Sequence, residues 1–309
     1  MTTSVRRPDP SDLDWSAETG LAAELRAVLT AATVADGAAP VDEAALLTLQ
    51  HHGLGASTLL VVGSPVDGFA WLHGGSVRLV VHPARRRQGL GRALLLGAME
   101  VTDHAQHTSL TAWSHTNHPG AAVLAAASGF ERVRDLWLMR LAIEDPGHLP
   151  ALPDPAGSGV VIRTFRPGYD EEAFLAVNAA AFASHAEQGQ LTRSDLEQRK
   201  SETWFDPAGF FVAETAHDPG GDLIGFHWTK VHPGDPGRGE VYVVGVSPRA
   251  HGSGLGRMLT LTGLHYLAGL GLREVILYVE ADNGPARAVY DRVGFTHADA
   301  DTHVMYHRS

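Results

Sequence analysis

Hydrophobic side chains recur every three or four positions in some stretches and alternate or run together in others, which separates helices from strands. In the first half this pattern predicts helices at 12–34, 41–52, 89–105 and 119–128, and strands at 58–63, 68–72, 76–81, 108–113 and 133–141. The second half repeats the order, with helices at 170–182, 192–201, 254–269 and 284–292, and strands at 160–163, 209–214, 222–230, 239–246, 273–279 and 301–307. Strands that alternate with helices predict an α/β fold with a mixed sheet.

A glycine turn occurs twice in this pattern. It reads Leu-Val-Val-His-Pro-Ala-Arg-Arg-Arg-Gln-Gly-Leu-Gly-Arg at 79–92 and Val-Gly-Val-Ser-Pro-Arg-Ala-His-Gly-Ser-Gly-Leu-Gly-Arg at 244–257. The same 165 positions separate Gly89 from Gly254 and the Gly129-Phe130 pair from Gly294-Phe295. One folded unit is therefore used twice. We expect domains at 1–143 and 160–309, joined by a linker at 144–159 with four prolines and three glycines.

Composition narrows the class of protein. The 309 residues are 44% hydrophobic and 19% charged, which is typical of a globular chain that buries a core. The chain has no cysteine, no apolar run of about 18 residues and no apolar leader, so we expect a cytoplasmic monomer without a membrane span. Its net charge of −11 disfavours nucleic-acid binding. The arginines around each glycine turn suit a small phosphorylated ligand instead.

Each glycine turn follows a strand and opens a helix, where unpaired backbone N–H groups and the helix dipole attract anions. Neither copy has the Gly-Lys-Ser/Thr of a P-loop, and neither has the third glycine of a dinucleotide fingerprint. We therefore expect a phosphate-binding turn of another type. The plain alternative is a strand–turn–helix junction without a ligand.

The turn Arg86-x-x-Gly89-x-Gly91 resembles the pyrophosphate signature of the GCN5-related N-acetyltransferases, Gln/Arg-x-x-Gly-x-Gly/Ala. In the second copy His251 stands where Gln or Arg is usual. The run Asn283-x-x-Ala286-x-x-x-Tyr290-x-x-x-Gly294-Phe295 is also typical of this family. The resemblance implies two tandem domains of that family, with acetyl-CoA as co-substrate and no metal.

An acetyltransferase must bring a neutral amine to a thioester, stabilise the oxyanion and protonate the leaving thiolate. An α-amine has a pKa of about 8, so the carboxylate of Glu240, on the strand before the turn, is a sufficient base, either directly or through one water. The hydroxyl of Tyr290 can protonate the sulfur, and the backbone N–H of Val246 can polarise the carbonyl. The 165-residue register places Gly75 and Ala125 at the matching positions. We therefore expect chemistry in the C-terminal half only.

A narrower resemblance covers most of the chain. Stretches such as Gly-Phe-His-Trp-Thr-Lys-Val-His-Pro at 225–233 and Gly-Glu-Val-Tyr-Val-Val-Gly-Val at 239–246 are similar to the mycothiol synthase family of tandem acetyltransferases. The resemblance implies acetyl transfer from acetyl-CoA to the cysteinyl amine of desacetylmycothiol, a cysteine–glucosamine–inositol compound, in the last step of mycothiol biosynthesis. It implies substrate contacts from Glu43, Glu187, Lys230, Glu240 and Tyr278, in a cleft between the halves.

The same resemblance implies the acetyl-CoA contacts. In the C-terminal half they are Val244, Gly245, Val246, His251, Gly252, Ser253, Gly254, Leu255, Gly256, Arg257, Asn283, Gly284, Pro285, Ala286, Arg287 and Ala288. In the N-terminal half they are Leu79, Val80, Val81, Arg87, Gln88, Gly89, Leu90, Gly91 and Arg92.

Two of these residues also have a purely structural interpretation. Lys230 can be a solvated surface lysine, and Glu43 can be a first-turn carboxylate that stabilises a helix dipole. The rival functions are a tandem N-acetyltransferase that acts on a protein N-terminus or an aminoglycoside, and a non-enzymatic acyl-CoA sensor. The 18 histidines are scattered without a metal-ligand spacing, so we expect no metal site.

Overall fold

The chain forms two compact units. The computed structural model describes residues 4–104, 109–143, 147, 149–152, 159–183, 186–217, 220, 222–235 and 237–309, with only the backbone of Ser11, Ala186 and Glu187. Unit 1 comprises Met1–Trp137 with Ala298–Ser309, and unit 2 comprises Leu138–His297.

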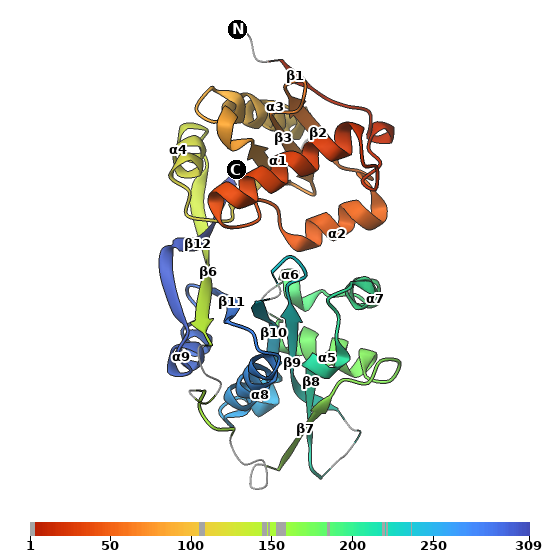
Figure 1. Ribbon diagram of the computed structural model, residues 1–309, viewed down its shortest axis with the longest axis vertical. Helices are drawn as coiled ribbons and strands as arrows, with labels where there is room; N and C mark the ends of the chain where they lie inside the picture. The colour runs from red at the N-terminus through yellow and green to blue at the C-terminus, as the bar shows by residue number, and fades with distance from the viewer. Residues whose placement is uncertain are drawn as a thin grey trace. The chain divides into compact units, whose positions relative to one another are not determined.

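Unit 1 is a mixed sheet with helices on both faces (Figure 1). Its strands are β1 (Val5–Arg6), β2 (Thr58–Val62), β3 (Gly68–His73), β4 (Ser76–Val81), β5 (Leu110–Ser114) and β12 (Thr296–Arg308), in the sheet order β1-β2-β3-β4-β5-β12. Its helices are α1 (Gly20–Asp36), α2 (Glu43–His52), α3 (Leu90–His104) and α4 (Pro119–Ala127). Only β4 and β5 pair in parallel; the other pairs are antiparallel.

Unit 2 repeats this plan. Its strands are β7 (Val160–Thr164), β8 (Phe210–Thr215), β9 (Leu223–Val231), β10 (Arg238–Val246), β11 (Glu274–Glu280) and part of β6 (Glu131–Ala142), in the order β7-β8-β9-β10-β11-β6. Its helices are α5 (Glu171–Ala181), α6 (Ala186–Gly189), α7 (Arg193–Ser201), α8 (Leu255–Gly269) and α9 (Gly284–Arg292). Strands β10 and β11 form the parallel pair. The predicted α/β fold with a mixed sheet is confirmed.

The sixth strand of each sheet comes from the other half of the chain. In unit 1, β12 pairs with β5 from Val304↔Ser114 to Arg308↔Leu110. In unit 2, β6 lies beside β11, and the backbone N–H of Ile143 donates to the carbonyl of Arg273 at 2.8 Å. The units therefore differ from the expected domains, 1–143 and 160–309, at these two strands. Most of the expected linker at 144–159 lies outside the described residues.

Most expected elements agree with the structure to within a few residues, and the largest difference is at the first helix. That helix, expected at 12–34, begins only at Gly20. Residues Pro10–Asp12 form a 3-10 turn instead, and the Asp14 carboxylate accepts a hydrogen bond from the backbone of Ser16 at 2.9 Å. Short polar side chains that bind nearby backbone groups compete in this way with helix formation. Strand β12 also begins five residues earlier than expected.

Aromatic packing holds the core of unit 2. The ring of Phe210 stacks on the rings of Trp228 and Phe165, with centroid distances of 4.6 and 4.3 Å. The ring of Phe174 in α5 packs edge-on against Phe210, with a centroid distance of 5.1 Å. Such pairs add to the stability that the buried area itself provides. They fasten α5 to β8 and β9, and β9 is paired along its length with β10.

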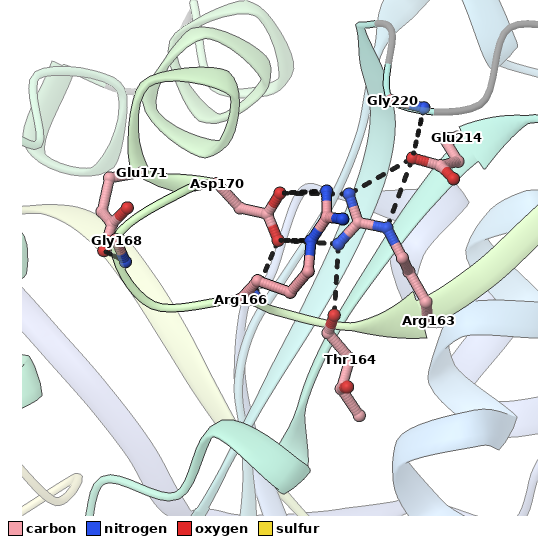
Figure 2. Close-up of polar contacts among 8 residues, drawn as sticks. All are labelled: Arg163, Thr164, Arg166, Gly168, Asp170, Glu171, Glu214 and Gly220. Atoms are coloured by element: carbon pink, nitrogen blue, oxygen red, sulfur yellow. Dashed lines mark hydrogen bonds and ion pairs between the residues drawn. The ribbon is translucent and has the colours of Figure 1, made fainter.

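A buried ionic cluster fastens the start of α5 to the sheet edge (Figure 2). The Arg163 guanidinium of β7 bridges Asp170 at 2.6 Å and Glu214 of β8 at 3.2 Å, and Arg166 contacts Asp170 at 3.2 Å. Burial alone would raise the pKa of Asp170. The hydrogen bonds from the side chains of Arg163 and Arg166 and from the Arg166 backbone outweigh burial and lower that pKa to about 2.

Replacing this carboxylate is expected to destabilise unit 2. Asp170→Asn leaves Arg163 with one charge partner fewer, so the free energy of unfolding should fall by about 2 kcal/mol at pH 7. In the wild type this contribution is complete above the ordinary Asp pKa of 3.8 and is lost as the pH falls toward 2, whereas the variant lacks that pH dependence. Urea unfolding at pH 7 and pH 3 measures both effects.

The matched control is Glu172→Gln on the same helix, because the Glu172 side chain is 83% exposed. It should change stability by no more than about 0.5 kcal/mol. An Asp170→Asn protein as stable as this control would contradict the role assigned to the cluster.

Candidate functional site

The two glycine turns have the same backbone conformation. Arg87 and Gly89 take φ values of 61° and 82°, and Gly252 and Gly254 take 79° and 83°. These are matching positions in the 165-residue register. The left-handed conformation turns the backbone sharply into the first turn of α3 or α8, where the helix N–H groups lack partners within the helix. Each unit thus has the anion-binding geometry predicted from sequence.

The side chains at the variable signature position perform the same task in both turns. Arg86 donates through Nε to the carbonyl of Val81 at 3.2 Å, and His251 donates through Nε2 to the carbonyl of Val246 at 3.2 Å. Each therefore closes the turn onto the last residue of the preceding strand. Arg86 also binds the Asp36 carboxylate in a bidentate pair at 2.6 and 2.7 Å. Histidine at 251 thus preserves the contact that shapes the turn.

The parallel strands diverge beside each turn. Pairing of β10 with β11 runs from Arg238↔Glu274 to Val241↔Leu277, although β10 continues to Val246. In unit 1, β4 pairs with β5 only at Ser76↔Thr111 and Val77↔Ala112. The end of each strand consequently presents one backbone edge to a ligand. The acetyl-CoA segments expected at 79–81 and 244–246 lie at these edges.

Unit 1 contains a cavity of about 490 Å³ where its strands diverge. Its lining includes eight of the nine expected N-terminal acetyl-CoA residues: Leu79, Val80, Val81, Arg87, Gly89, Leu90, Gly91 and Arg92. Gln88 does not line it. Ala125 of α4 does, at the position that Tyr290 occupies in unit 2, and so does Tyr306 from β12. The role of these residues in binding acetyl-CoA stays a prediction.

In unit 2, the expected base is buried beside a lysine and a histidine. Glu240 and Lys230 are opposite each other in the β9–β10 pair and are 6% and 7% exposed. The Nε2 atom of His232 lies 2.9 Å from Oε2 of Glu240. Sequence reasoning missed His232. The sequence could have indicated it, because His232 follows Lys230 by two residues in an extended segment. Residues two apart in such a segment direct their side chains to the same face.

Lys230 is held by aromatic rings. Its Nζ lies 4.5 Å from the ring centroid of Trp204 and 5.2 Å from that of Tyr242. Tyr242 lies where the β9–β10 register shifts, and its hydroxyl accepts a hydrogen bond from Nε of Arg199 at 3.0 Å. The alternative that Lys230 is a solvated surface lysine is therefore wrong. Sequence reasoning also missed Trp204, Tyr242 and Arg199 as neighbours of Lys230, because they come from separate elements.

These polar residues lie on a hairpin extension that unit 1 lacks. Gly74 and Gly75 join β3 to β4 directly, with φ values of 54° and 75°. In unit 2 the hairpin is longer. Strand β9 continues to Val231, and β10 begins at Arg238, whereas the counterpart of Ser76, the first residue of β4, is Val241. Gly75 stands at the register position of Glu240, so the short hairpin of unit 1 carries neither the carboxylate nor the lysine.

The expected acid is on α9. Asn283 caps this helix by accepting a hydrogen bond from the backbone of Ala286 at 3.2 Å, as predicted. Tyr290 is buried and meets the ring of Phe295 edge-on at 5.9 Å. Burial raises the pKa of Tyr290 above its usual range. The hydroxyl therefore stays protonated and can donate, but at a higher cost than an ordinary phenol.

The remaining expected substrate residues are placed as follows. Tyr278 is 40% exposed on β11. Glu43 is the first residue of α2 in unit 1, directly after the N-cap Asp42. The backbone of Glu187 lies in α6, while its side chain is outside the described part of the structure. Substrate contacts from these three residues stay predictions.

The described part of the chain has neither a metal-binding cluster nor a membrane-spanning helix. No group of three or more His, Cys, Asp or Glu side chains with metal-binding geometry occurs among the residues that the structure describes. Across the same ranges, every helix is too short or too polar to cross a membrane.

Comparison with known proteins identifies the family. Residues 176–295 match the model of the acetyltransferase (GNAT) family. A mycothiol acetyltransferase from Nocardioides sp. is 50% identical over 298 residues, covering 93% of this chain and 98% of that protein. Another, from Catenulispora acidiphila, is 45% identical and covers 98% of this chain and 97% of its own. The chain belongs to the mycothiol acetyltransferase family. It is an acetyl-CoA-dependent N-acetyltransferase.

Two solved structures align with nearly the whole chain, and one of them is described as a tandem GNAT protein. A tandem GNAT protein from the clavulanic acid biosynthesis pathway aligns with a TM-score of 0.72 and 25% identity, over 99% of this chain and 98% of that one. A GCN5-related N-acetyltransferase from Sphaerobacter thermophilus aligns with a TM-score of 0.68 and 25% identity, over 99% and 95%. The prediction of two tandem acetyltransferase folds is confirmed.

The hydrogen bond from His251 to Val246 should support acetyl-CoA binding in this member of the mycothiol acetyltransferase family. His251→Ala should raise KM for acetyl-CoA about fivefold, the effect of losing roughly one hydrogen bond, with little change in kcat. His251→Arg restores the donor found at Arg86 and should restore KM. Initial rates at varied acetyl-CoA measure both variants, and a wild-type KM in His251→Ala would remove the role assigned to this side chain.

Proposed function

We propose that unit 2 transfers the acetyl group of acetyl-CoA to the cysteinyl amine of desacetylmycothiol, the last step of mycothiol biosynthesis. The observation that carries the proposal is the buried carboxylate of Glu240 on the strand that leads into the second glycine turn. The names of the relatives at 45% and 50% identity support this acceptor.

The reaction divides among three groups of unit 2. Glu240 removes a proton from the substrate ammonium, whose pKa is about 8. The amine nitrogen then attacks the thioester carbonyl, the C–S bond breaks, and the Tyr290 hydroxyl donates its proton to the leaving thiolate. The nitrogen loses a second proton as the amide forms, and this proton restores the Tyr290 hydroxyl. Burial raises the pKa of Tyr290, which keeps the hydroxyl protonated until the thiolate leaves but increases the cost of the donation.

The direction of the backbone amides supports Val246 as the oxyanion donor. The N–H of Ser247 donates to the carbonyl of Ile224 at 2.9 Å, on the β9 side of the strand. Successive amides of a strand point to opposite edges. The N–H of Val246 therefore faces the edge from which β11 has diverged, where a thioester oxygen can accept it.

Substrate recognition would use the polar groups around Glu240. Lys230 supplies a cation held by two rings, and Tyr278 supplies an exposed hydroxyl. An inositol–glucosamine substrate has many hydroxyls that accept and donate hydrogen bonds. We propose that Glu43 and Glu187 provide the remaining acceptors. A protein N-terminus or an aminoglycoside remains a second acceptor class, while a sensor without turnover is disfavoured by membership of an enzyme family.

We propose that unit 1 binds acetyl-CoA but does not catalyse acetyl transfer. Its cavity retains the glycine turn and the diverging strands, but Gly75 and Ala125 carry neither a base nor an acid. We propose a bound cofactor there that stabilises the fold of unit 1. The monomeric state and the cytoplasmic location expected from the sequence stay predictions.

Variants that lack the proposed base or acid test whether unit 2 catalyses the reaction or only binds its ligands. Glu240→Gln should lower kcat/KM about 100-fold or more, because general-base catalysis contributes that much. Tyr290→Phe should lower kcat about tenfold or more for the same reason. Mass-spectrometric detection of acetylated desacetylmycothiol measures turnover, with Tyr306→Phe in unit 1 as the matched control that keeps the wild-type rate. Full activity in both unit 2 variants would refute the proposal.

The two glycine turns offer a matched pair of variants. A side chain at Gly91 or Gly256 meets only ordinary contacts, the nearest at 3.5 Å and 3.7 Å. Glutamate at either place sets a negative charge beside the expected phosphates. Gly91→Glu should lose one equivalent of bound acetyl-CoA and keep its turnover. Gly256→Glu should keep one equivalent and lose turnover.

Isothermal titration with acetyl-CoA counts the sites in both proteins. The proposal for unit 1 fails if the wild type binds only one equivalent, or if Gly91→Glu abolishes turnover.

A further inference from the structure

One titratable group beside Glu240 has no role in the steps above. The Nε2 atom of His232 lies 2.9 Å from Oε2 of Glu240. The Glu240 side chain is 8% exposed, whereas that of His232 is 28% exposed. The imidazole therefore lies against the shielded carboxylate through its buried Nε2 atom, while other atoms of the side chain reach solvent.

The hairpin fixes His232 in this position. Its backbone N–H donates to the carbonyl of Arg238 at 3.1 Å, and its carbonyl accepts from the N–H of Asp235 at 3.1 Å. The other charged groups here are engaged with each other: Arg238 pairs with Glu274 of β11 at 2.8 Å and with Asp235 at 3.5 Å. Lys230 lies against the rings of Trp204 and Tyr242. Histidine is thus the hairpin residue suited to exchange a proton near neutral pH.

The balance of the reaction requires such an exchange. A substrate ammonium and acetyl-CoA yield an amide, a thiol and one proton in excess. If Glu240 takes the first proton of the ammonium, it must lose that proton before the next turnover. Its burial gives it little direct contact with water.

We infer that His232 carries this proton from Glu240 to solvent: Oε2 of Glu240 gives the proton to Nε2, and the ring releases a proton from Nδ1 to water. The electron pairs stay on oxygen and nitrogen, and no other reactant is needed. His232 acts through Glu240 and is a positioning and relay residue. The inference rests on the proposed function, because it takes Glu240 as the base.

Kinetics of the full chain test the relay. His232→Gln keeps a hydrogen-bond donor but cannot relay a proton, so kcat should fall about tenfold while KM for both substrates changes about twofold or less. In His232→Ala, added imidazole should restore a large part of kcat, and the pH dependence of kcat should follow the added base. His217→Gln, at an exposed position of unit 2, is the matched control with the wild-type rate.

Two outcomes would overturn the relay. One is a wild-type kcat and pH profile in His232→Gln. The other is a loss of activity that accompanies a lower melting temperature and that imidazole does not restore, which indicates a structural role.

The choice of acceptor separates this inference from the proposed function. The relay concerns the proton held by Glu240, so His232→Gln should lower kcat about tenfold with any amine that the wild type acetylates. A wild-type protein that fails to acetylate the cysteinyl amine refutes the proposed acceptor. An unchanged kcat of His232→Gln with an amine that is acetylated refutes the relay.

Discussion

The early end of parallel pairing between two strands is the constraint on which both proposed ligand sites depend. Strand β10 leaves β11 after Val241, and β4 leaves β5 after Val77. A continuous ladder would use every backbone group of these strands and would fill the space beside the glycine turns. Divergence instead leaves the outer edge of β10 without a strand partner beyond Val241, and the cavity of unit 1 lies where its own strands diverge. The turn, the helix N-terminus and the strand edge then form one continuous surface for an extended, phosphorylated ligand.

The two units differ where chemistry needs side chains. The β3–β4 hairpin closes at Gly74 and Gly75, while the longer β9–β10 hairpin carries Lys230, His232 and Glu240. Ala125 lines the unit 1 cavity where unit 2 has a tyrosine. Both copies thus share the glycine turn and the diverging strands, and the proposed acid–base groups occur on a local extension and one helix of a single copy. A longer hairpin can add a buried carboxylate without changing the place where the parallel strands diverge.

The glycine turns show which part of a signature the geometry requires. Arg86 and His251 differ in charge and size, yet each donates to the last carbonyl of the preceding strand. The left-handed residues recur at matching places as well, with Arg87 in one turn where the other has Gly252. What is common to both copies is a donor at the correct reach and a backbone that turns sharply. The nature of the donor varies because Asp36 is available to balance the charge of Arg86 in unit 1.

The sequence by itself determined the repeated order of elements, the two glycine turns, the cap at Asn283, the mixed α/β fold and the choice of Glu240 and Tyr290 as candidates. These are local features, since periodicity, glycine placement and motif spacing depend on nearby residues. Only the tertiary structure decided that β12 completes the sheet of unit 1 and β6 that of unit 2, that Lys230 lies against the rings of Trp204 and Tyr242, and that His232 touches Glu240. Each of those depends on hydrogen bonds and packing between segments distant in the chain, and such pairings leave no periodic signal along it.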